Sequence, residues 1–194
     1  MRSRASSLSP FKLFSQRKNS IHDAAFENDV QAVINICKRD EEAANLKEIQ
    51  HLQTPLHVAC MEGHGGLVEV LIGFKADPNQ RDCNGWTAMH FCCSSGKQTT
   101  FDICKLLVKL GKASVDALTN TGATPLHYLV RKEQANSSLQ EFEENIKFLI
   151  DNGTDINSQS IHGETPLHQA VARGRINAVR YLISFGANLN LRTK

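Results

Sequence analysis

The chain has 194 residues, of which 41% are hydrophobic, and its formal net charge is only +2. This composition supports a sizeable core in water, and no run of about 18 apolar residues is present to span a membrane. The charge is uneven, because residues 1–20 contain five basic residues and no acidic residue. The remaining 17 basic and 20 acidic residues give residues 21–194 a charge of −3, so we expect no nucleic-acid partner.

Residues 1–18 are rich in serine, arginine and lysine, and their few apolar residues are scattered. We expect them to form a disordered basic tail. Two Arg-x-x-Ser stretches make Ser7 and Ser20 candidates for modification by basophilic kinases. An acid-free start of this kind also resembles an organelle transit peptide, although Pro10 would interrupt a long amphipathic helix.

A four-residue pattern recurs along the rest of the chain. Thr54–His57 reads Thr-Pro-Leu-His, and related copies stand at Thr87–His90, Thr124–His127 and Thr165–His168, with intervals of 33, 37 and 41 residues. A degenerate fifth copy, without the threonine and proline, stands at Ile21–Ala25. Threonine before proline predicts a helix start, because the hydroxyl can accept from a first-turn N–H and proline has no N–H to leave unpaired.

Each copy predicts a pair of short helices. In the copy at Thr54–His57 the first helix of the pair begins at Pro55. Gly63 supplies the left-handed residue that ends this helix after about two turns. Apolar residues at 67–72 nearly surround the helix that follows, so this helix must be covered on several sides. The pattern therefore predicts units that bury their apolar faces only against one another.

The interval near 33 and the Thr-Pro-Leu-His motif resemble the ankyrin repeat family. The resemblance implies an all-α ankyrin-repeat solenoid of stacked helix-turn-helix units joined by β-hairpin loops, within residues 19–194. Residues 19–49 depart from the family pattern and are interpreted as the N-terminal cap, with a second helix near Val30–Arg39. The expected repeats are 19–49, 50–81, 82–118, 119–159 and 160–194.

Repeat four is about eight residues longer than repeat two between its two helices. Ser138–Glu141 forms a capping-box pattern, and Leu139 and Phe142 are in helical phase with the second helix. We therefore expect this helix to start about two turns early. If Leu139 and Phe142 lie beyond the neighbouring repeats, they form an exposed apolar site for a partner; the alternative is a tolerated surface insertion.

Repeat five returns to regular length before the sequence stops at Lys194. By the family pattern another Gly-x-Thr-Pro-Leu would follow, so we expect this chain to be the N-terminal part of a longer protein. The alternative is that Arg173, Arg175 and Arg180 make repeat five tolerant of solvent by themselves.

The regular histidines and the cysteines could suggest chemistry. The histidines recur once per repeat, so they should be spaced along the stack instead of converging on one site. Cys60, Cys92 and Cys93 occupy small-residue helix positions, where packing explains them better than a zinc or redox site. We expect no catalytic residue, cofactor or metal. The cysteine spacing suits a reducing compartment, and we expect a cytoplasmic protein, with the nucleus as an alternative.

In the family, hairpin tips and first helices form a concave surface that contacts partners. Trp86, the only tryptophan, is the best anchor on that surface, unless it packs on the adjacent hairpin. The resemblance places the following residues at contact positions: Gln53, Met61, Glu62, Asn84, Trp86, Ser94, Ser95, Thr121, Arg131, Lys132, His162, Glu164 and Arg173.

We therefore expect a monomeric, non-enzymatic protein-interaction module, the N-terminal ankyrin region of a larger signalling or scaffold protein. One alternative is a stand-alone adaptor or inhibitor that occludes its target. Another is the regulatory arm of an enzyme whose catalytic domain lies beyond residue 194. Asn157 resembles the hairpin asparagines that asparaginyl hydroxylases modify in ankyrin proteins, although it could simply stabilise its turn.

Overall fold

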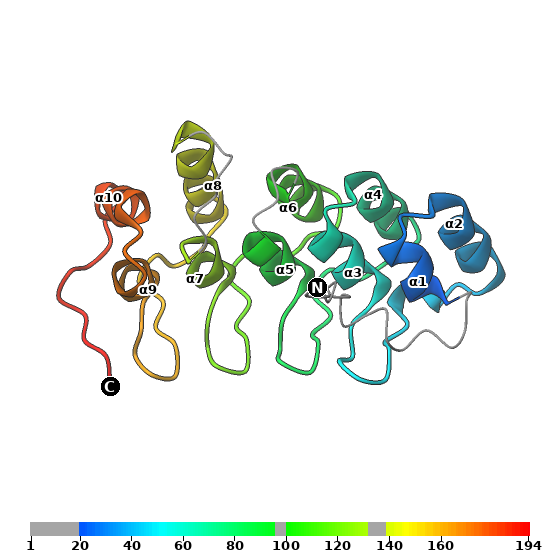
Figure 1. Ribbon diagram of the computed structural model, residues 1–194, viewed down its shortest axis with the longest axis horizontal. Helices are drawn as coiled ribbons and strands as arrows, with labels where there is room; N and C mark the ends of the chain where they lie inside the picture. Colours follow the sequence, from blue (N-terminus) through cyan, green and yellow to red (C-terminus); the bar gives the residue numbers. More distant parts are fainter. Residues whose placement is uncertain (1–19, 96–99, 132–138) are drawn as a thin grey trace, which may run out of the picture.

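The computed structural model describes residues 20–95, 100–131 and 139–194. Within these residues the α-helices pair in sequence order, and the pairs stack side by side along the long axis of the molecule (Figure 1). The odd-numbered helices lie between the even-numbered helices and a set of long loops, so we call them inner and outer helices and call the loops hairpin loops. The inner helices are α1 (Ile21–Phe26), α3 (Pro55–Glu62), α5 (Ala88–Ser95), α7 (Pro125–Leu129) and α9 (Pro166–Ala172). The outer helices are α2 (Val30–Arg39), α4 (Gly65–Gly73), α6 (Thr100–Lys109), α8 (Leu139–Asp151) and α10 (Ile176–Ser184), and a 3-10 turn, η2, spans Ala43–Asn45.

The helix starts follow from the threonine motif as predicted. The Thr54 hydroxyl accepts from the His57 amide at 3.4 Å, and Pro55 occupies the first turn. Gly63 ends α3 with a φ of 78°, the left-handed conformation that glycine adopts without strain. The expected second helix of repeat one is also confirmed, since α2 spans Val30–Arg39.

A histidine in each of α3, α5 and α7 extends the cap beyond what the sequence predicted. The Thr54 amide donates to His57 Nδ1 at 2.9 Å, and the Thr124 amide donates to His127 Nδ1 at 3.1 Å. Because Nδ1 accepts, Nε2 carries the proton and donates to the following repeat: His127 Nε2 lies 3.0 Å from the Glu164 carbonyl oxygen. The histidine therefore joins its own helix start to the next repeat.

The core forms between the stacked layers. Leu56, Leu126 and Leu182 are almost fully buried, and α7 packs against α5, α8 and α9. Both neighbouring layers are needed to cover an inner helix of about two turns, because such a helix has little apolar area of its own. The predicted all-α solenoid is confirmed.

The loops turn tightly but do not form β-strands within the residues that the structure describes. Each turn closes through a backbone bond, such as Thr119 N to Ala123 O at 3.0 Å. Single backbone bonds, such as Asn120 N to Asn84 O at 2.9 Å, join the tips of successive loops. The loops therefore follow the path of β-hairpins, as expected. They do not pair as β-strands, because isolated hydrogen bonds do not make a continuous ladder.

Helix α8 is longer than its outer-row neighbours, with 13 residues against ten in α6 and nine in α10, as the sequence predicted. Its first residue, Leu139, is 57% exposed. Phe142, however, is only 8% exposed, with its ring 6.3 Å from that of Tyr181 in α10. The prediction that Phe142 is exposed for a partner is wrong, because the next repeat reaches α8 and covers it. Ser138 and the preceding loop lie outside the described residues.

We expect Thr124→Ala to lower the free energy of unfolding by roughly 0.5–2 kcal/mol, the usual range for a lost helix cap. The Thr124 hydroxyl is buried and lies 2.9 Å from His127 Nδ1, so the substitution removes a buried contact at the start of α7. Urea unfolding would measure the change, with the exposed Ser114→Ala as the matched control. Equal stability of both variants would contradict the capping role.

Candidate functional site

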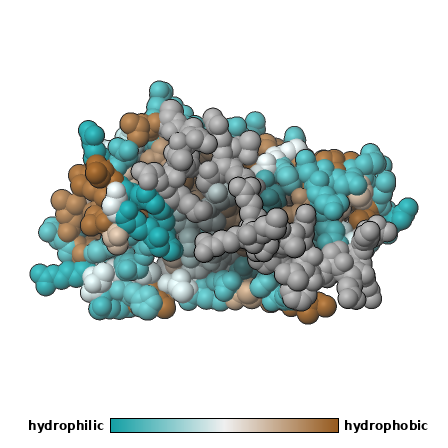
Figure 2. Space-filling model, in the orientation of Figure 1, coloured by the Kyte–Doolittle hydropathy of each residue, from teal (hydrophilic) through white to brown (hydrophobic). Residues whose placement is uncertain are grey.

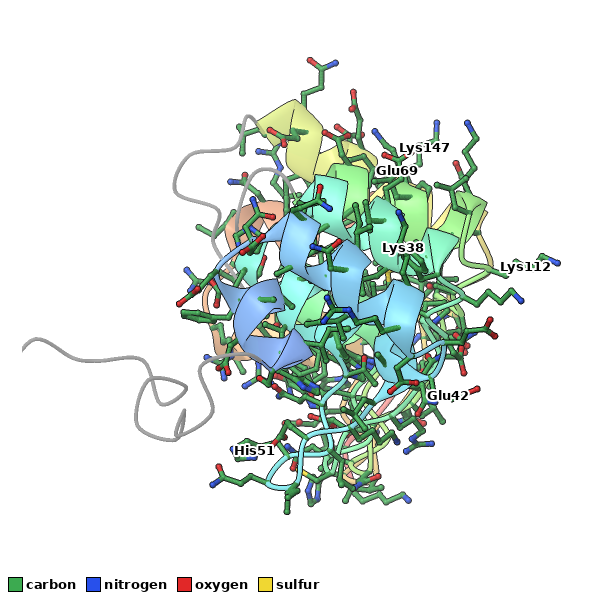
Figure 3. All side chains as sticks on the ribbon, turned by 90° about the vertical axis from the view of Figure 1, so that its right-hand side faces the viewer. Lys38, Glu42, His51, Glu69, Lys112 and Lys147 are labelled. Carbon is green, nitrogen blue, oxygen red and sulfur yellow. The ribbon has the colours of Figure 1, made fainter. Side chains whose placement is uncertain are left out.

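The predicted contact residues lie on one side of the stack. Asn84, Thr121 and His162 are exposed at the tips of hairpin loops, while Trp86 and Glu164 stand directly before the inner helices. We call the surface formed by the hairpin loops and inner helices the inner face. Figure 3 looks along the stack and shows His51 near the loop tips, with Glu69 and Lys147 of the outer helices at the opposite end. The others are at the ends of inner helices: Met61 and Glu62 in α3, Ser94 and Ser95 in α5, Arg131 after α7 and Arg173 after α9, with Gln53 before α3.

An aromatic cluster is the most distinctive feature of the inner face. The Trp86 ring lies 4.3 Å from the Tyr128 ring of α7 and 5.1 Å from the Phe91 ring of α5. Trp86 and Tyr128 are half-buried, whereas Phe91 is buried beneath them. The rings are tilted relative to one another, an arrangement favoured by their quadrupoles. Trp86 therefore both packs on a neighbouring repeat and keeps part of its surface open.

Arg131 extends this cluster. Its guanidinium lies 5.4 Å from the centre of the Tyr128 ring, within the range of a cation–π contact. Its backbone carbonyl accepts from Arg175 Nε at 3.2 Å, which ties the end of α7 to repeat five. Lys132 lies outside the described residues. We call Trp86, Tyr128 and Arg131 the aromatic strip.

Sequence reasoning missed Tyr128. Its position follows the motif histidine, where repeats two and five have Val58 and Gln169. The sequence does contain a signal for it, because repeat four has an aromatic residue at this position and the preceding repeat contains Trp86. Only the structure shows that the two rings meet.

Burial favours the neutral form of four of the repeat histidines. Burial lowers the pKa of His57 and of His90 to about 4, and it also lowers the pKa values of His22 and His127. In His57 and His90 both ring nitrogens are within hydrogen-bonding distance of protein atoms. These rings have no lone pair left for a metal or a substrate proton, which fits the structural role inferred from their spacing.

The cysteines are unpaired thiols, and all except Cys83 are buried. Cys60, Cys92 and Cys93 belong to the hydrophobic core, as their helix positions predicted. Among the described residues, no three His, Cys, Asp or Glu side chains are grouped so that they could hold a metal ion. In the same part of the chain, no helix combines the length and the apolar character needed to cross a bilayer.

The modification candidates have different surroundings. Ser7 lies outside the described residues. Ser20 is half-buried at the start of α1. Its hydroxyl accepts from the Asp23 amide at 3.1 Å and donates to the Asp23 carboxylate at 2.7 Å. Asn157 is half-buried, and its side-chain oxygen accepts from the Asn188 amide at 2.8 Å. Modification of Asn157 stays a prediction.

Comparison with known proteins agrees with this architecture. A family profile of three ankyrin repeats matches residues 21–111, 56–160 and 102–193. The B-cell lymphoma 3 protein homolog of Mus musculus is 28% identical over 173 residues, which cover 88% of this chain and 37% of that protein. Ankyrin repeat and SOCS box protein 16 of Homo sapiens is 30% identical over 198 residues, covering 91% of this chain and 41% of that protein.

A third relative, tyrosine-protein kinase HTK16 of Hydra vulgaris, is 31% identical over 143 residues, covering 71% of this chain and 17% of that protein. The chain therefore spans less than half the length of each of these relatives. Ankyrin repeats are protein–protein interaction modules and are generally not catalytic. With the profile matched from residue 21 to residue 193, and five helix pairs stacked in the part of the chain that the structure describes, the chain belongs to the ankyrin repeat family.

Proposed function

We propose that this chain is a non-enzymatic protein-interaction module that holds its partner on the inner face, with the aromatic strip as the anchor. The observation that carries the proposal is the partly open Trp86–Tyr128 pair, whose ring centroids are 4.3 Å apart and which Arg131 flanks. Trp, Tyr and Arg are the residue types most often found at binding hot spots. Their grouping on the inner face supports one central contact there.

The surroundings of the strip suit an interface. The exposed loop tips at Asn84 and Thr121 are polar, and they stand beside the partly apolar strip. A polar rim around an aromatic centre is typical of protein–protein interfaces. Phe91 is buried beneath Trp86, so the indole has a firm support and loses little conformational freedom when a partner binds.

The larger context is also part of the proposal. We infer a monomeric module without a nucleic-acid partner in the cytoplasm or nucleus, within a larger signalling or scaffold protein; the unpaired cysteines favour a reducing compartment. A stand-alone adaptor or inhibitor is a second candidate. A regulatory arm of an enzyme is a third, supported by the likeness to tyrosine-protein kinase HTK16. A kinase or other catalytic sequence in the same reading frame would distinguish the third candidate from the first two.

We expect Trp86→Ala to weaken partner binding by at least about 30-fold, which corresponds to the 2 kcal/mol that defines a hot spot. The partner would first be captured on the immobilised chain from a lysate of the source cells and identified. Its affinity for each variant would then be measured by calorimetry. Phe91→Leu is the matched control, because it also removes a ring contact with Trp86 but leaves the surface intact.

Circular dichroism would confirm that both variants are folded at the assay temperature. A large loss of affinity in Trp86→Ala, with a much smaller loss in Phe91→Leu, supports the aromatic strip. An equal loss in both variants would show that binding depends on repeat packing alone, and full affinity in Trp86→Ala would remove the strip from the interface.

A further inference from the structure

One position at the ends of the inner helices changes its charge from repeat to repeat. The repeat histidines are His22, His57, His90, His127 and His168. Five residues after these histidines the sequence has, in order, Glu27, Glu62, Ser95, Lys132 and Arg173. Glu27 and Arg173 cap the ends of α1 and α9, and Glu62 and Ser95 are the last residues of α3 and α5. The charge therefore changes from negative through neutral to positive along the stack.

The positive end of this series borders the aromatic strip. Lys132 lies outside the described residues, but Arg131 beside it has its guanidinium 5.4 Å from the centre of the Tyr128 ring. Arg175 adds a second cation here, since its Nε donates to the Arg131 carbonyl at 3.2 Å. Figure 2 shows strongly hydrophilic surface in the area where Figure 1 places α7 and α9. We call Glu27, Glu62, Ser95, Arg131 and Arg173 the charge row.

The charge row is open to solvent and regularly spaced. Glu27 and Arg173 are exposed, whereas Glu62, Ser95 and Arg131 are half-buried. The inner helices pack directly on one another in the order α1, α3, α5, α7 and α9. Because the axes of packed helices are about 8–10 Å apart, consecutive members of the row are separated by about that distance.

Most other charged residues of these repeats lie away from the row. The basic residues of repeats one and two are in the outer helix α2 or in loops: Lys38, Arg39, Lys47, Lys75 and Arg81. The acidic residues of α8 belong to an outer helix: Glu141, Glu143, Glu144 and Asp151. Glu164 stands before α9, at the opposite end of that helix from Arg173, and its carboxylate accepts from Gln169. Glu133 lies outside the described residues. The described ends of the inner helices therefore keep opposite charges in the two halves of the stack.

The spacing of the row matches one conformation of a bound peptide. A polyproline-II segment has three residues per turn and rises about 3.1 Å per residue, so its side chains recur about every 9.3 Å. This distance falls within the interval of about 8–10 Å between packed helices. Every third side chain of such a segment would therefore face a successive repeat. Segments of this kind dock in grooves lined by aromatic residues, as the aromatic strip provides.

We propose that the inner face binds an extended segment of a partner protein that is basic at one end, apolar at its centre and acidic at the other end. This inference rests on the function proposed above and adds the chemistry of the partner. The basic end lies against Glu27 and Glu62, and the apolar centre lies against the Trp86 ring. The acidic end lies against Arg131 and Arg173. One contact in every third residue places the basic and acidic groups of the segment about nine residues apart.

The basic tail of this chain matches only half of the row. Residues 1–20 contain five basic residues and no acidic residue, so they complement Glu27 and Glu62 but not Arg131 and Arg173. A partner segment with both charges complements both ends of the row. Such a segment is also fixed in one direction, because the reversed orientation places like charges together.

Panning of a peptide library tests the inference. Random peptides of about 16 residues, long enough to reach all five repeats, would be displayed on phage and selected on the immobilised chain. We expect the enriched peptides to have Lys or Arg near one end and Asp or Glu near the other, about nine residues apart, with an apolar residue between them. The most enriched peptide would be synthesised with a fluorescent label, and its affinity would be measured by anisotropy.

Two double variants each reverse one end of the row. Glu27→Lys with Glu62→Lys removes the negative end, and Arg131→Glu with Arg173→Glu removes the positive end. We expect each double variant to lower the affinity of the selected peptide at least about tenfold, because repulsion replaces attraction at that end. Fresh panning should then select acidic peptides on the first variant and basic peptides on the second.

Matched controls make the same changes in net charge elsewhere. Glu42→Lys with Glu69→Lys, and Lys38→Glu with Lys147→Glu, alter exposed side chains in or beside the outer helices (Figure 3). We expect each control to change the affinity less than about twofold, since salt screens charges that lie more than a Debye length from the peptide. Circular dichroism would confirm that all four double variants are folded.

The outcomes separate this inference from the inner-face proposal. Enriched peptides without the charge order, or an unchanged affinity in both row variants, would overturn the inference. If Trp86→Ala still weakens those peptides, the inner-face site stands without the charge preference; if it does not, both proposals fail. Absence of any enriched peptide would show that the inner face does not bind a linear segment. Peptides that bind only after the five basic residues of the tail are replaced by serine would assign the acidic half to the tail instead.

Discussion

Leu126→Ala is expected to lower the free energy of unfolding by about 2–5 kcal/mol, the range observed when a fully buried leucine is truncated. Leu126 has no measurable exposure and lies in α7, which packs against α5, α8 and α9. The methyl groups it loses therefore leave a cavity between layers that several helices would have to move to fill. Because neighbouring repeats stabilise one another, the loss affects the whole array.

Urea unfolding monitored by circular dichroism would measure the loss, with Leu118→Ala as the matched control. Leu118 is 48% exposed, so the same chemical change there should cost less than about 0.5 kcal/mol. A loss below about 1 kcal/mol for Leu126→Ala would show that this side chain does not hold the layers together.

Stability is expected to fall as the pH is lowered from 8 to 5, because His57 and His90 are buried in their neutral form. Their pKa values are about 4 in the folded chain, and the ordinary value of 6.5 applies once the chain unfolds. The unfolded chain therefore binds more protons between pH 6.5 and 4, so stability rises with pH across this window. By pH 5 the loss amounts to about 2 kcal/mol for each histidine, at 1.36 kcal/mol per unit of pKa difference.

Urea unfolding at pH 8, 6.5 and 5 would measure this loss, and NMR titration of the ring protons would assign it to individual histidines. The His22 and His127 pKa values are lowered as well, so their contributions have the same sign. The Glu48 pKa is also lowered: burial acts to raise it, but the amides of Gln50, His51 and Gln53 outweigh burial. The stability that Glu48 contributes is lost only as the pH falls below its ordinary value of 4.5, outside the tested window. Unchanged stability from pH 8 to 5 would contradict the neutral histidine caps.

The helix pairs could be predicted from the sequence because their signals are local. Thr54 and Pro55 define a helix start within two residues, and Gly63 defines its end. The recurrence of these signals then predicted the stacking, since short helices of this kind can be buried only by like neighbours. The cap itself was predicted incompletely, because the use of His57 Nδ1 as an acceptor depends on a side-chain orientation that spacing does not determine.

Contacts between repeats were the part that sequence reasoning could not supply. Phe142 was expected to be open because α8 is long, yet Tyr181 of the next repeat covers it. Trp86 was recognised as a possible anchor, but its meeting with Tyr128 depends on how two repeats are placed relative to one another. Both contacts depend on how side chains of neighbouring repeats pack together. The repeat motif predicts that the repeats stack, but not which side chains meet.

The proposed inner-face site would be tested most directly by site-specific photocross-linking. A benzophenone amino acid in place of Tyr128 would report on the aromatic strip, and the same group in place of Glu69 on the outer helix α4 would report on the opposite side (Figure 3). Binding at the inner face predicts that the captured partner cross-links from position 128 and not from position 69. Cross-linking from position 69 alone, with both variants folded, would show that the partner binds the outer helices.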